Sequence, residues 1–433
     1  MRGVILLVAA GAAARLNGQA NGLPLQPTRH IRFETHEGTW MSVDVSPDGR
    51  TIVFDLLGDL YTVPMAGGRA TRITSGIAAD YQPRFSPDGR RIVFVSDRDG
   101  SFNLWLVAPD GGHPREMTHA RYLDQEGRRF LQPVWTPDGR AIVVSESDDA
   151  SGSFDLMAYD TLGQAWPDVA LRAPAPPASD GAWAGAYYTA GAAFGRDFGG
   201  LYATQFTGTH GRWDPQAATY QVIHVAWPNG ERRTVTTETG SAVQPLVSPD
   251  GRYLAYATTY PSRHGPTTGL RLLDQETGVT KWCLDHIEPS LQGSIVAWQQ
   301  GLLPNAAFTP DGAAIVVSFD GKLWHVAVPS CQVRPIPFTA TVDQKLGPLL
   351  RFSTRADDGP ATARVIRELQ PSPDGKWLAF VALGKVWIVA LPDGTSQRLT
   401  NARSDQTEYA PAWSPDGRYL AFASWSERGG DIY

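Results

Sequence analysis

The chain is poor in cysteine, in long apolar runs and in segregated charge. Only Cys283 and Cys331 occur among 433 residues, and a fold of this size does not need disulfide bonds to hold it together. After the first twenty residues no stretch has 18 consecutive apolar residues, which excludes a multi-span membrane protein. The 38 Lys and Arg and 44 Asp and Glu are mixed along the chain, so no basic arm suggests a nucleic-acid partner.

The sequence also lacks the common motifs of hydrolytic, metal and phosphate sites. It has no His-Glu-x-x-His and no Gly-x-Ser-x-Gly, and Gly321-Lys322 and Gly375-Lys376 lack the rest of a phosphate loop. No histidine is two residues from another among His30, His36, His113, His119, His210, His224, His264, His286 and His325. We therefore predict no catalytic, cofactor-binding or metal-binding residue in this chain.

The N-terminus predicts export. Arg2 precedes a short apolar run, Val4 to Ala14, and small residues follow at Gly18 and Ala20. This pattern is typical of a secretory signal peptide, here residues 1–20, and the alternative is a buried N-terminal strand or helix. Cleavage after Ala20 predicts a periplasmic or secreted protein without a membrane span. Export would permit a Cys283–Cys331 bridge, but the sequence does not place the two residues within bonding range, and we do not predict one.

Glycine and proline are abundant. Together they make 77 of 433 residues (44 + 33), about 18% against a typical value of roughly 12%. They are spread over the whole chain, and the hydrophobic content of 42% is sufficient for a core. The composition indicates a turn-rich, all-β protein rather than a helical bundle.

A tetrapeptide, Ser/Thr-Pro-Asp-Gly, recurs seven times. The copies begin at Ser46, Ser86, Thr136, Ser248, Thr309, Ser372 and Ser414. Each precedes a short apolar run such as Ile92 to Phe94, and successive copies are 40, 50, 112, 61, 63 and 42 residues apart. Because the interval of 112 is about twice the usual one, we expect a degenerate copy within it, and residues 194–202 overlay the pattern. The sequence therefore contains eight repeat units.

The chemistry of the tetrapeptide is that of a tight turn. Pro presets φ near −65°, Asp makes local hydrogen bonds, and Gly takes the left-handed conformation that returns the chain into an antiparallel partner. Seven aspartates at matching positions could suggest metal binding, but we interpret them as turn residues.

Each repeat continues with a third, apolar strand and a polar outer strand, as in residues 102–108 and 113–118. Four short antiparallel strands in about 40–45 residues are typical of a β-propeller blade, which is stable only beside other blades. We therefore predict an all-β fold, a β-propeller of four-stranded antiparallel blades. Tryptophans recur at one point of the repeat, and we interpret them as packing between blades: Trp105, Trp135, Trp324, Trp387 and Trp413.

Two stretches carry a family resemblance, Glu37-Gly-Thr-Trp-Met-Ser-Val-Asp44 and Phe54-Asp-Leu-Leu-Gly-Asp-Leu-Tyr61. They resemble the N-terminal TolB-type or tricorn-like propeller of exported bacterial amidohydrolases. The resemblance implies hydrolysis of amide-type bonds by a separate domain that holds a divalent metal. The His-x-His of that domain is absent here. The partner implied is a catalytic domain of the same protein or a protein or peptide partner.

Three functions remain open at this point. The chain could be the accessory propeller of an exported amidohydrolase, a stand-alone periplasmic TolB-like binding scaffold, or the propeller of a prolyl-oligopeptidase-like serine peptidase.

Two architectures also remain open. Residues 29–345 could close a six-bladed propeller, with residues 351–433 as two further blades that start a second, truncated propeller. Alternatively all eight units could share one ring. Residues 430–433 match the beginning of a third strand, and we therefore expect this sequence to be a fragment of a longer exported protein.

Overall fold

A computed structural model describes residues 26–120, 128–148, 153–166, 189–195, 199–207, 220–227, 229–262, 265–288, 301–347, 362–401 and 405–433. The chain divides into two compact units, Met1–Leu349 and Leu350–Tyr433. Every regular element among the described residues is a strand, so no helix there could cross a membrane. The predicted signal peptide, residues 1–20, lies outside the described residues.

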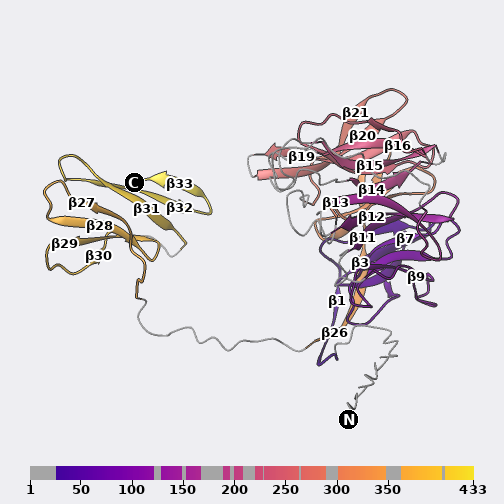
Figure 1. Cartoon of the computed structure of the whole chain (residues 1–433), viewed down its shortest axis with the longest axis horizontal. Coiled ribbons are helices and arrows are strands. Elements are labelled where there is room, and N and C mark those ends of the chain that lie inside the picture. The colour runs from indigo at the N-terminus through magenta and orange to yellow at the C-terminus, as the bar shows by residue number, and fades with distance from the viewer. Residues whose placement is uncertain are drawn as a thin grey trace, which may run out of the picture. The chain divides into compact units, whose positions relative to one another are not determined.

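The N-terminal unit contains six antiparallel sheets, blades 1 to 6 in chain order (Figure 1). Blade 1 comprises β2 (Val43–Val45), β3 (Thr51–Leu56), β4 (Asp59–Pro64) and β6 (Thr71–Arg72). Blade 2 comprises β7 (Asp80–Phe85), β8 (Ile92–Ser96), β9 (Asn103–Val107) and β10 (Arg115–Glu116). Blade 3 comprises β11 (Arg129–Trp135), β12 (Ala141–Asp148) and β13 (Ser153–Asp160). Blade 4 comprises β14 (Thr189–Phe194), β15 (Gly200–Phe206), β16 (Tyr220–Ala226) and β17 (Arg232–Thr234). Blade 5 comprises β18 (Ala242–Val247), β19 (Tyr253–Ser262), β20 (Gly265–Asp274) and β21 (Thr280–Leu284). Blade 6 comprises β22 (Ala307–Phe308), β23 (Ala314–Phe319), β24 (Lys322–Ala327) and β25 (Val333–Ile336).

The prediction of propeller blades is confirmed. Blade 4 is the unit expected from the degenerate copy, with β14 and β15 on either side of it; residues 196–198 of its turn lie outside the described residues.

The repeated tetrapeptide forms the turn between the first two strands of a blade. In blade 2, Ser86 Oγ donates to Asp88 Oδ1 over 2.6 Å and accepts from Arg91 N over 3.0 Å. Gly89 has φ 68°, the left-handed conformation predicted for it. The serine hydrogen bond holds the pKa of Asp88 below its usual value. The same pair of side-chain bonds recurs in all seven copies, which confirms the turn interpretation.

Apolar clusters join neighbouring blades. Trp135 of blade 3 is 5% exposed and packs with Val93 and Leu104 of blade 2. Trp105 is half-buried against Leu60 of blade 1. The predicted packing role of the tryptophans is thus confirmed at these positions, because each apolar face is covered only by the next blade.

The ring closes after six blades. Gly38 N donates to Gly321 O and Val43 N donates to Asn305 O, both over 2.9 Å, so the start of blade 1 is bonded to blade 6. Met41 and Val316 lie in one buried cluster across this contact. Because blade 6 occupies the free face of blade 1, a single ring of eight blades is wrong. The boundaries 29–345 and 351–433 stay a prediction.

A two-stranded ribbon fastens the ring at blade 1. β1 (Arg29–Thr35) pairs with β26 (Phe338–Leu346) in antiparallel register, and β26 also pairs with the short β5 (Gly68–Arg69). Phe338, a buried residue of β26, packs against Phe54 of blade 1, with ring centroids 5.1 Å apart. The ribbon therefore ties both ends of the ring's sequence to the same blade.

The C-terminal unit consists of blades 7 and 8. Blade 7 is β27 (Arg367–Pro371), β28 (Trp377–Ala382), β29 (Lys385–Ala390) and β30 (Gln397–Arg398), and blade 8 is β31 (Thr407–Trp413), β32 (Leu420–Ser426) and β33 (Gly429–Ile432). Residues 430–432 are in a third strand, as the sequence predicted.

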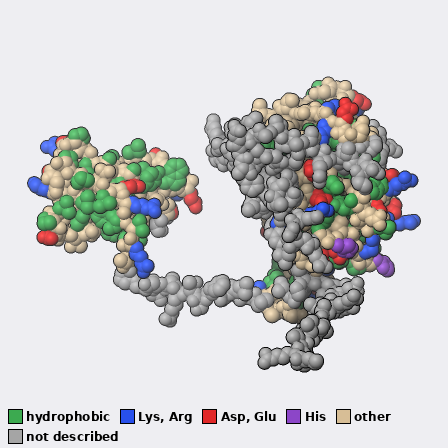
Figure 2. All heavy atoms as spheres, in the orientation of Figure 1, with side chains coloured by type: hydrophobic (Ala, Val, Ile, Leu, Met, Phe, Trp, Pro, Cys, Tyr) green, Lys and Arg blue, Asp and Glu red, His purple; other side chains and the backbone are tan. Residues whose placement is uncertain are grey.

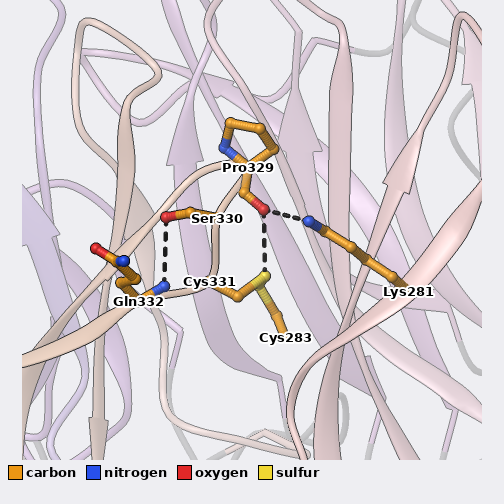
Figure 3. The surroundings of a disulfide bond; sticks show 6 residues. All are labelled: Lys281, Cys283, Pro329, Ser330, Cys331 and Gln332. Atoms are coloured by element: carbon orange, nitrogen blue, oxygen red, sulfur yellow. Dashed lines mark hydrogen bonds between the residues drawn. A yellow bond between two sulfur atoms is a disulfide. The ribbon is translucent and has the colours of Figure 1, made fainter.

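Cys283 and Cys331 form a disulfide bond, a pairing that the sequence left open (Figure 3). Cys283 is in β21 of blade 5, and Cys331 follows β24 of blade 6. Forty-eight residues separate the two in sequence, and the packing of blade 5 against blade 6 brings them together. Beside the bond, Lys281 donates to the carbonyl oxygen of Pro329.

Candidate functional site at the centre of the propeller

The first strands of four of the six blades in the N-terminal unit carry a bulge at the same point. The pairing of β7, β11, β14 and β18 with the next strand shifts register there. Gln82, Gln132 and Gln244 occupy the bulge with φ of 57°, 52° and 54°, and Gly191 takes this place in blade 4 with φ 66°. A bulge re-aims a side chain, and here it leaves three glutamine side chains almost completely buried.

These glutamines belong to a closed hydrogen-bonded circuit, which we call the central polar ring: Ser42, Asp55, Gln82, Gln132, Gln244 and Asn305. Gln82 Oε1 accepts from Gln132 N over 2.7 Å. Gln132 Nε2 donates to Gln244 Oε1 over 2.6 Å, and Gln244 Nε2 donates to Asn305 Oδ1 over 2.8 Å. The circuit therefore links blades 2, 3 and 5 to the segment just before blade 6.

The circuit is completed at the junction of blades 6 and 1. Asn305 N donates to Ser42 Oγ over 3.1 Å, and Ser42 N donates to Asp55 Oδ1 over 2.9 Å. Asp55 Oδ2 then accepts from Gln82 N over 2.8 Å. The buried Nδ2 of Asn305 has no hydrogen-bond partner within the described part of the chain.

Gly191 of blade 4 leaves space for the hydrogen bond between Gln132 of blade 3 and Gln244 of blade 5. A Cβ atom at this position would lie 3.3 Å from Gln244 Oε1 and 3.4 Å from Gln132 Nε2, tighter than most contacts of a real Cβ. Its amide donates to Ser145 Oγ of blade 3 over 3.0 Å. A side chain here would therefore separate the two glutamines.

Asp55 is the acidic member of the central polar ring and is 7% exposed. Burial raises the pKa of its carboxyl to about 7, against the opposing effect of the two backbone N–H donors. Burial raises the pKa of the nearby Tyr81 phenol, and the charges of Asp97 and Asp55 add to the shift. The side chains of the central polar ring can donate and accept hydrogen bonds, and the carboxyl of Asp55 can hold or release a proton near neutral pH.

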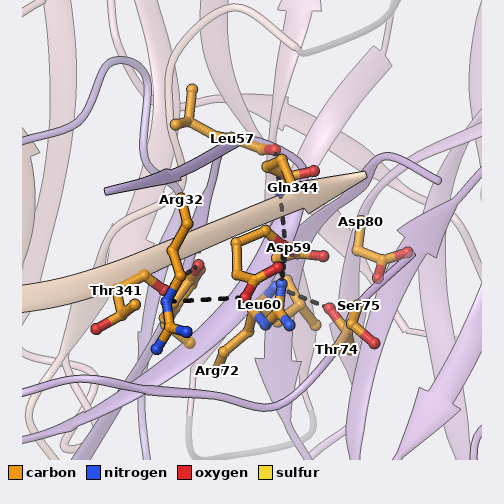
Figure 4. Close-up of polar contacts among 12 residues, drawn as sticks. Arg32, Leu57, Asp59, Leu60, Arg72, Thr74, Ser75, Asp80, Thr341 and Gln344 are labelled. Carbon is orange, nitrogen blue, oxygen red and sulfur yellow. Dashed lines mark hydrogen bonds and ion pairs between the residues drawn. The ribbon is translucent and has the colours of Figure 1, made fainter. Parts of the chain in front are cut away.

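A second polar cluster fixes β26 to blade 1 (Figure 4). Gln344 Nε2 donates to Asp59 Oδ2 over 2.8 Å and to the carbonyl oxygen of Leu57 over 3.0 Å. Arg72 contacts the same Asp59 oxygen over 3.2 Å, while burial raises the pKa of Asp59 to about 7. In blade 2, Asp80 pairs with Arg98. The two bonds of Gln344 thus hold β26 against blade 1.

The structure distributes the remaining candidate residues over the surface. The turn aspartates lie one to a blade, and no three His, Cys, Asp or Glu side chains gather as a metal site in the described ranges. His30 lies against Asp343 on the ribbon, and on blade 6 His325 Nε2 accepts from Arg334 over 3.0 Å. His210 and His264 lie outside the described residues.

Reasoning from the sequence missed the central polar ring. A signal was present, because a Gln-Pro pair stands four residues before the turn tetrapeptide in three repeats: Gln82-Pro83, Gln132-Pro133 and Gln244-Pro245. Proline has no N–H to give to a ladder, so it tolerates a bulge. The contact between glutamines of different blades, however, could not be read from this spacing.

The fold defines the class of this protein as a β-propeller. Residues 26–183 match the family model of the tricorn protease N-terminal β-propeller domain. The N-terminal repeats are therefore those of a TolB-type, tricorn-like β-propeller.

Three curated relatives match shorter segments. Tricorn protease homolog 1 of Streptomyces coelicolor is 33% identical over 73 residues, 17% of this chain and 7% of its own length. An uncharacterized peptidase of Bacillus subtilis is 25% identical over 185 residues, 42% of this chain and 22% of its own. The Tol-Pal system protein TolB of Bordetella pertussis is 42% identical over 57 residues, 13% of each chain. The chain thus spans less than a quarter of each of these relatives.

Proposed function

We propose that this chain is a non-catalytic propeller module of an exported multidomain hydrolase, which supports or gates a catalytic domain outside these residues. The observation that carries the proposal is the match of residues 26–183 to the propeller domain of a protease, in a chain that spans small shares of two peptidase relatives. A ring closed by hydrogen bonds between blades is a rigid support, and the loops of such a scaffold are where partners usually bind.

The parent enzyme that we favour is a metal-dependent amidohydrolase. The support is the resemblance of residues 37–44 and 54–61, and the structure gives these residues defined places: Ser42 and Asp55 in the central polar ring, and Asp59 in the contact with β26. The divalent metal would belong to the catalytic domain.

The names of two relatives, a protease homolog and a peptidase, favour a second candidate, the propeller of a peptidase, which we propose to be of the serine type. The TolB match favours a third, a periplasmic scaffold that binds a protein or peptide. The next segment of the coding sequence separates the three. A His-x-His after a strand supports the amidohydrolase, Gly-x-Ser-x-Gly the peptidase, and an immediate stop codon the scaffold.

Activity assays test the non-catalytic role directly. We expect purified residues 21–433 to hydrolyse neither amide nor peptide substrates, with or without added Zn²⁺ or Mn²⁺. The product of the whole gene should hydrolyse amides, lose activity with a chelator and regain it with metal. Metal-dependent turnover by residues 21–433 alone would refute the proposal, whereas inactivation of the whole protein by a serine-directed reagent would favour the peptidase.

We also propose a periplasmic or secreted location. The Cys283–Cys331 bond supports it, because disulfides persist in oxidising compartments. Fractionation of the source cells tests this: we expect the protein outside the cytoplasm and without residues 1–20, and a cytoplasmic protein with its N-terminus intact would contradict it.

A further inference from the structure

A pocket lies on the N-terminal unit at the place where the ring closes. It has a volume of about 410 Å³ and is lined by His36, Gly68, Lys322 and residues 335–339, and we call it the closure pocket. The lining comes from the segment after β1, from β5, from blade 6 and from the beginning of β26. Both ends of the ring's sequence therefore form the pocket, and its size lies within the range of about 300–1,000 Å³ that is usual for ligand sites.

The floor and the walls of the closure pocket are apolar. Ile336 and Phe338 are each 4% exposed and belong to the buried cluster that joins blade 6 to blade 1. Pro335 and Pro337 are exposed beside them, and a proline has no N–H to offer a ligand. The pocket therefore favours a ligand with an apolar body.

Close backbone contacts hold the pocket in shape. Gly68 N donates to Pro337 O over 2.8 Å. A Cβ atom at Gly67 would collide with the same oxygen, whereas a Cβ atom at Gly68 would meet nothing within 4 Å. The turn thus lies against Pro337 at Gly67 and leaves open space at Gly68. Because the pocket exists without a ligand, binding requires little ordering of the chain.

The polar groups of the pocket are a cation and hydrogen-bond donors. Lys322 is exposed, and its amine makes no hydrogen bond or ion pair with any described residue. His36 Nδ1 lies 3.0 Å from Thr339 Oγ1 and 3.3 Å from the carbonyl oxygen of Phe338. In the tautomer that accepts from Thr339, His36 Nε2 carries the hydrogen and can donate it to a ligand. None of the described residues that line the pocket is acidic.

This local excess of positive charge differs from the rest of the N-terminal unit. Figure 2 shows Lys and Arg side chains interspersed with Asp and Glu on the visible side of that unit. Exposed cations there have acidic partners, as Arg69 has Glu34 and Arg252 has Asp274, each over 2.9 Å. The amine of Lys322, which lacks such a partner, provides charge complementarity for an anion.

We propose that the closure pocket binds a small monocarboxylate with an apolar body. The carboxylate contacts the amine of Lys322 and Nε2 of His36, and the apolar body lies against Pro335 and Pro337. Because residues distant in sequence form the pocket only in the folded ring, the ligand also stabilises the ring against unfolding.

A titration of the purified chain with phenylacetate, followed by the ligand's own NMR signals, tests the proposal. We expect a dissociation constant on the order of 1 mM or lower. Phenylacetamide, which has the same shape without the charge, and acetate, which lacks the apolar body, should each bind at least about tenfold more weakly. Phenylacetate should raise the unfolding temperature in calorimetry, and phenylacetamide should not.

Two variants place the ligand in the closure pocket. Lys322→Gln removes the cation, and Pro335→Glu puts a carboxylate into the apolar wall; each should weaken the binding of phenylacetate about tenfold or more. Lys345→Gln provides the matched control, since Lys345 is exposed near the other end of β26 and outside the pocket, and it should change the affinity by less than about twofold. Circular dichroism should show the same strand content in all three variants.

Three results would each overturn the proposal: no binding of phenylacetate at ten times the expected dissociation constant, equal affinity for phenylacetamide, or an affinity that neither Lys322→Gln nor Pro335→Glu changes. The proposed hydrolase role is unaffected by these results, because its tests measure activity rather than binding.

Discussion

At the scale of single residues, buried amides distinguish the centre of this propeller. Gln132 and Gln244 exchange a hydrogen bond across blade 4, where Gly191 leaves the space. Such a bond is strong inside a protein because water does not compete for it, and its loss leaves buried partners unsatisfied. The central polar ring therefore stabilises the fold mainly because each of its six residues is hydrogen-bonded to the next.

Gln244→Leu tests this contribution. The variant keeps the approximate volume but leaves Gln132 Nε2 and Asn305 Oδ1 without their partner. We expect the free energy of unfolding, measured in urea, to fall by about 2–4 kcal/mol. Gln332→Leu on the exposed surface should change it by less than about 0.5 kcal/mol. Equal effects of the two variants would show that the central bonds are not responsible.

The pKa of Asp55 predicts a pH dependence of stability. Its carboxyl titrates near 3.8 when unfolded and at about 7 when folded. Between these values the folded state holds a proton that the unfolded state has lost, so this contribution to stability declines as the pH rises from about 4 to 7. Asp55→Asn removes the titration, and comparison with the variant cancels the similar contribution of Asp59.

We therefore expect the difference in unfolding free energy, wild type minus Asp55→Asn, to decrease steadily between pH 4.5 and 7 and to level off above. Urea titrations at four pH values measure it. A difference that stays constant or grows with pH would mean that the folded state does not retain this proton.

At the scale of elements, the blade hairpins could be predicted because their information is local. Ser86, Asp88 and Gly89 lie within four residues, and their hydrogen bonds and backbone angles depend on no other blade. The disulfide could not be predicted. Its cysteines are in different blades, and their distance depends on how blade 5 and blade 6 pack.

The disulfide should stabilise the contact between blades 5 and 6. Cross-linking residues 48 apart restricts the unfolded chain, and by the chain-entropy model Cys283→Ser should lower the free energy of unfolding by about 4 kcal/mol. Cys331→Ser should have the same effect. Denaturation with and without reductant provides the control, because reduction should weaken the wild type and leave a variant that carries both Cys283→Ser and Cys331→Ser unchanged.

At the scale of the whole molecule, the contact of blade 6 with blade 1 closes the ring of six blades. The bonds from Gly38 and Val43 to blade 6, and the pairing of β1 with β26, join the two ends of the unit. Once blade 6 covers the free apolar face of blade 1, no face of the six blades is left for a further blade. This explains why blades 7 and 8 form a separate unit.

A fragment of residues 26–349 should therefore fold alone. We expect a single-chain mass and one cooperative unfolding transition by calorimetry. The matched fragment 26–303, which lacks blade 6 and β26, should bind a hydrophobic dye or aggregate, because blades 1 and 5 then expose apolar faces. If both fragments were equally soluble and cooperative, closure would not be the source of stability.

The repeat, the turn, the apolar strand and hence the propeller follow from local sequence, because a tetrapeptide that makes its own hydrogen bonds predicts the same hairpin wherever it occurs. Three features depend on how the blades pack: the closure of the ring at six blades, the contact of Cys283 with Cys331, and the meeting of glutamines from separate blades at the centre. These contacts depend on the rotation from each blade to the next, and that rotation is set by the packing of whole faces.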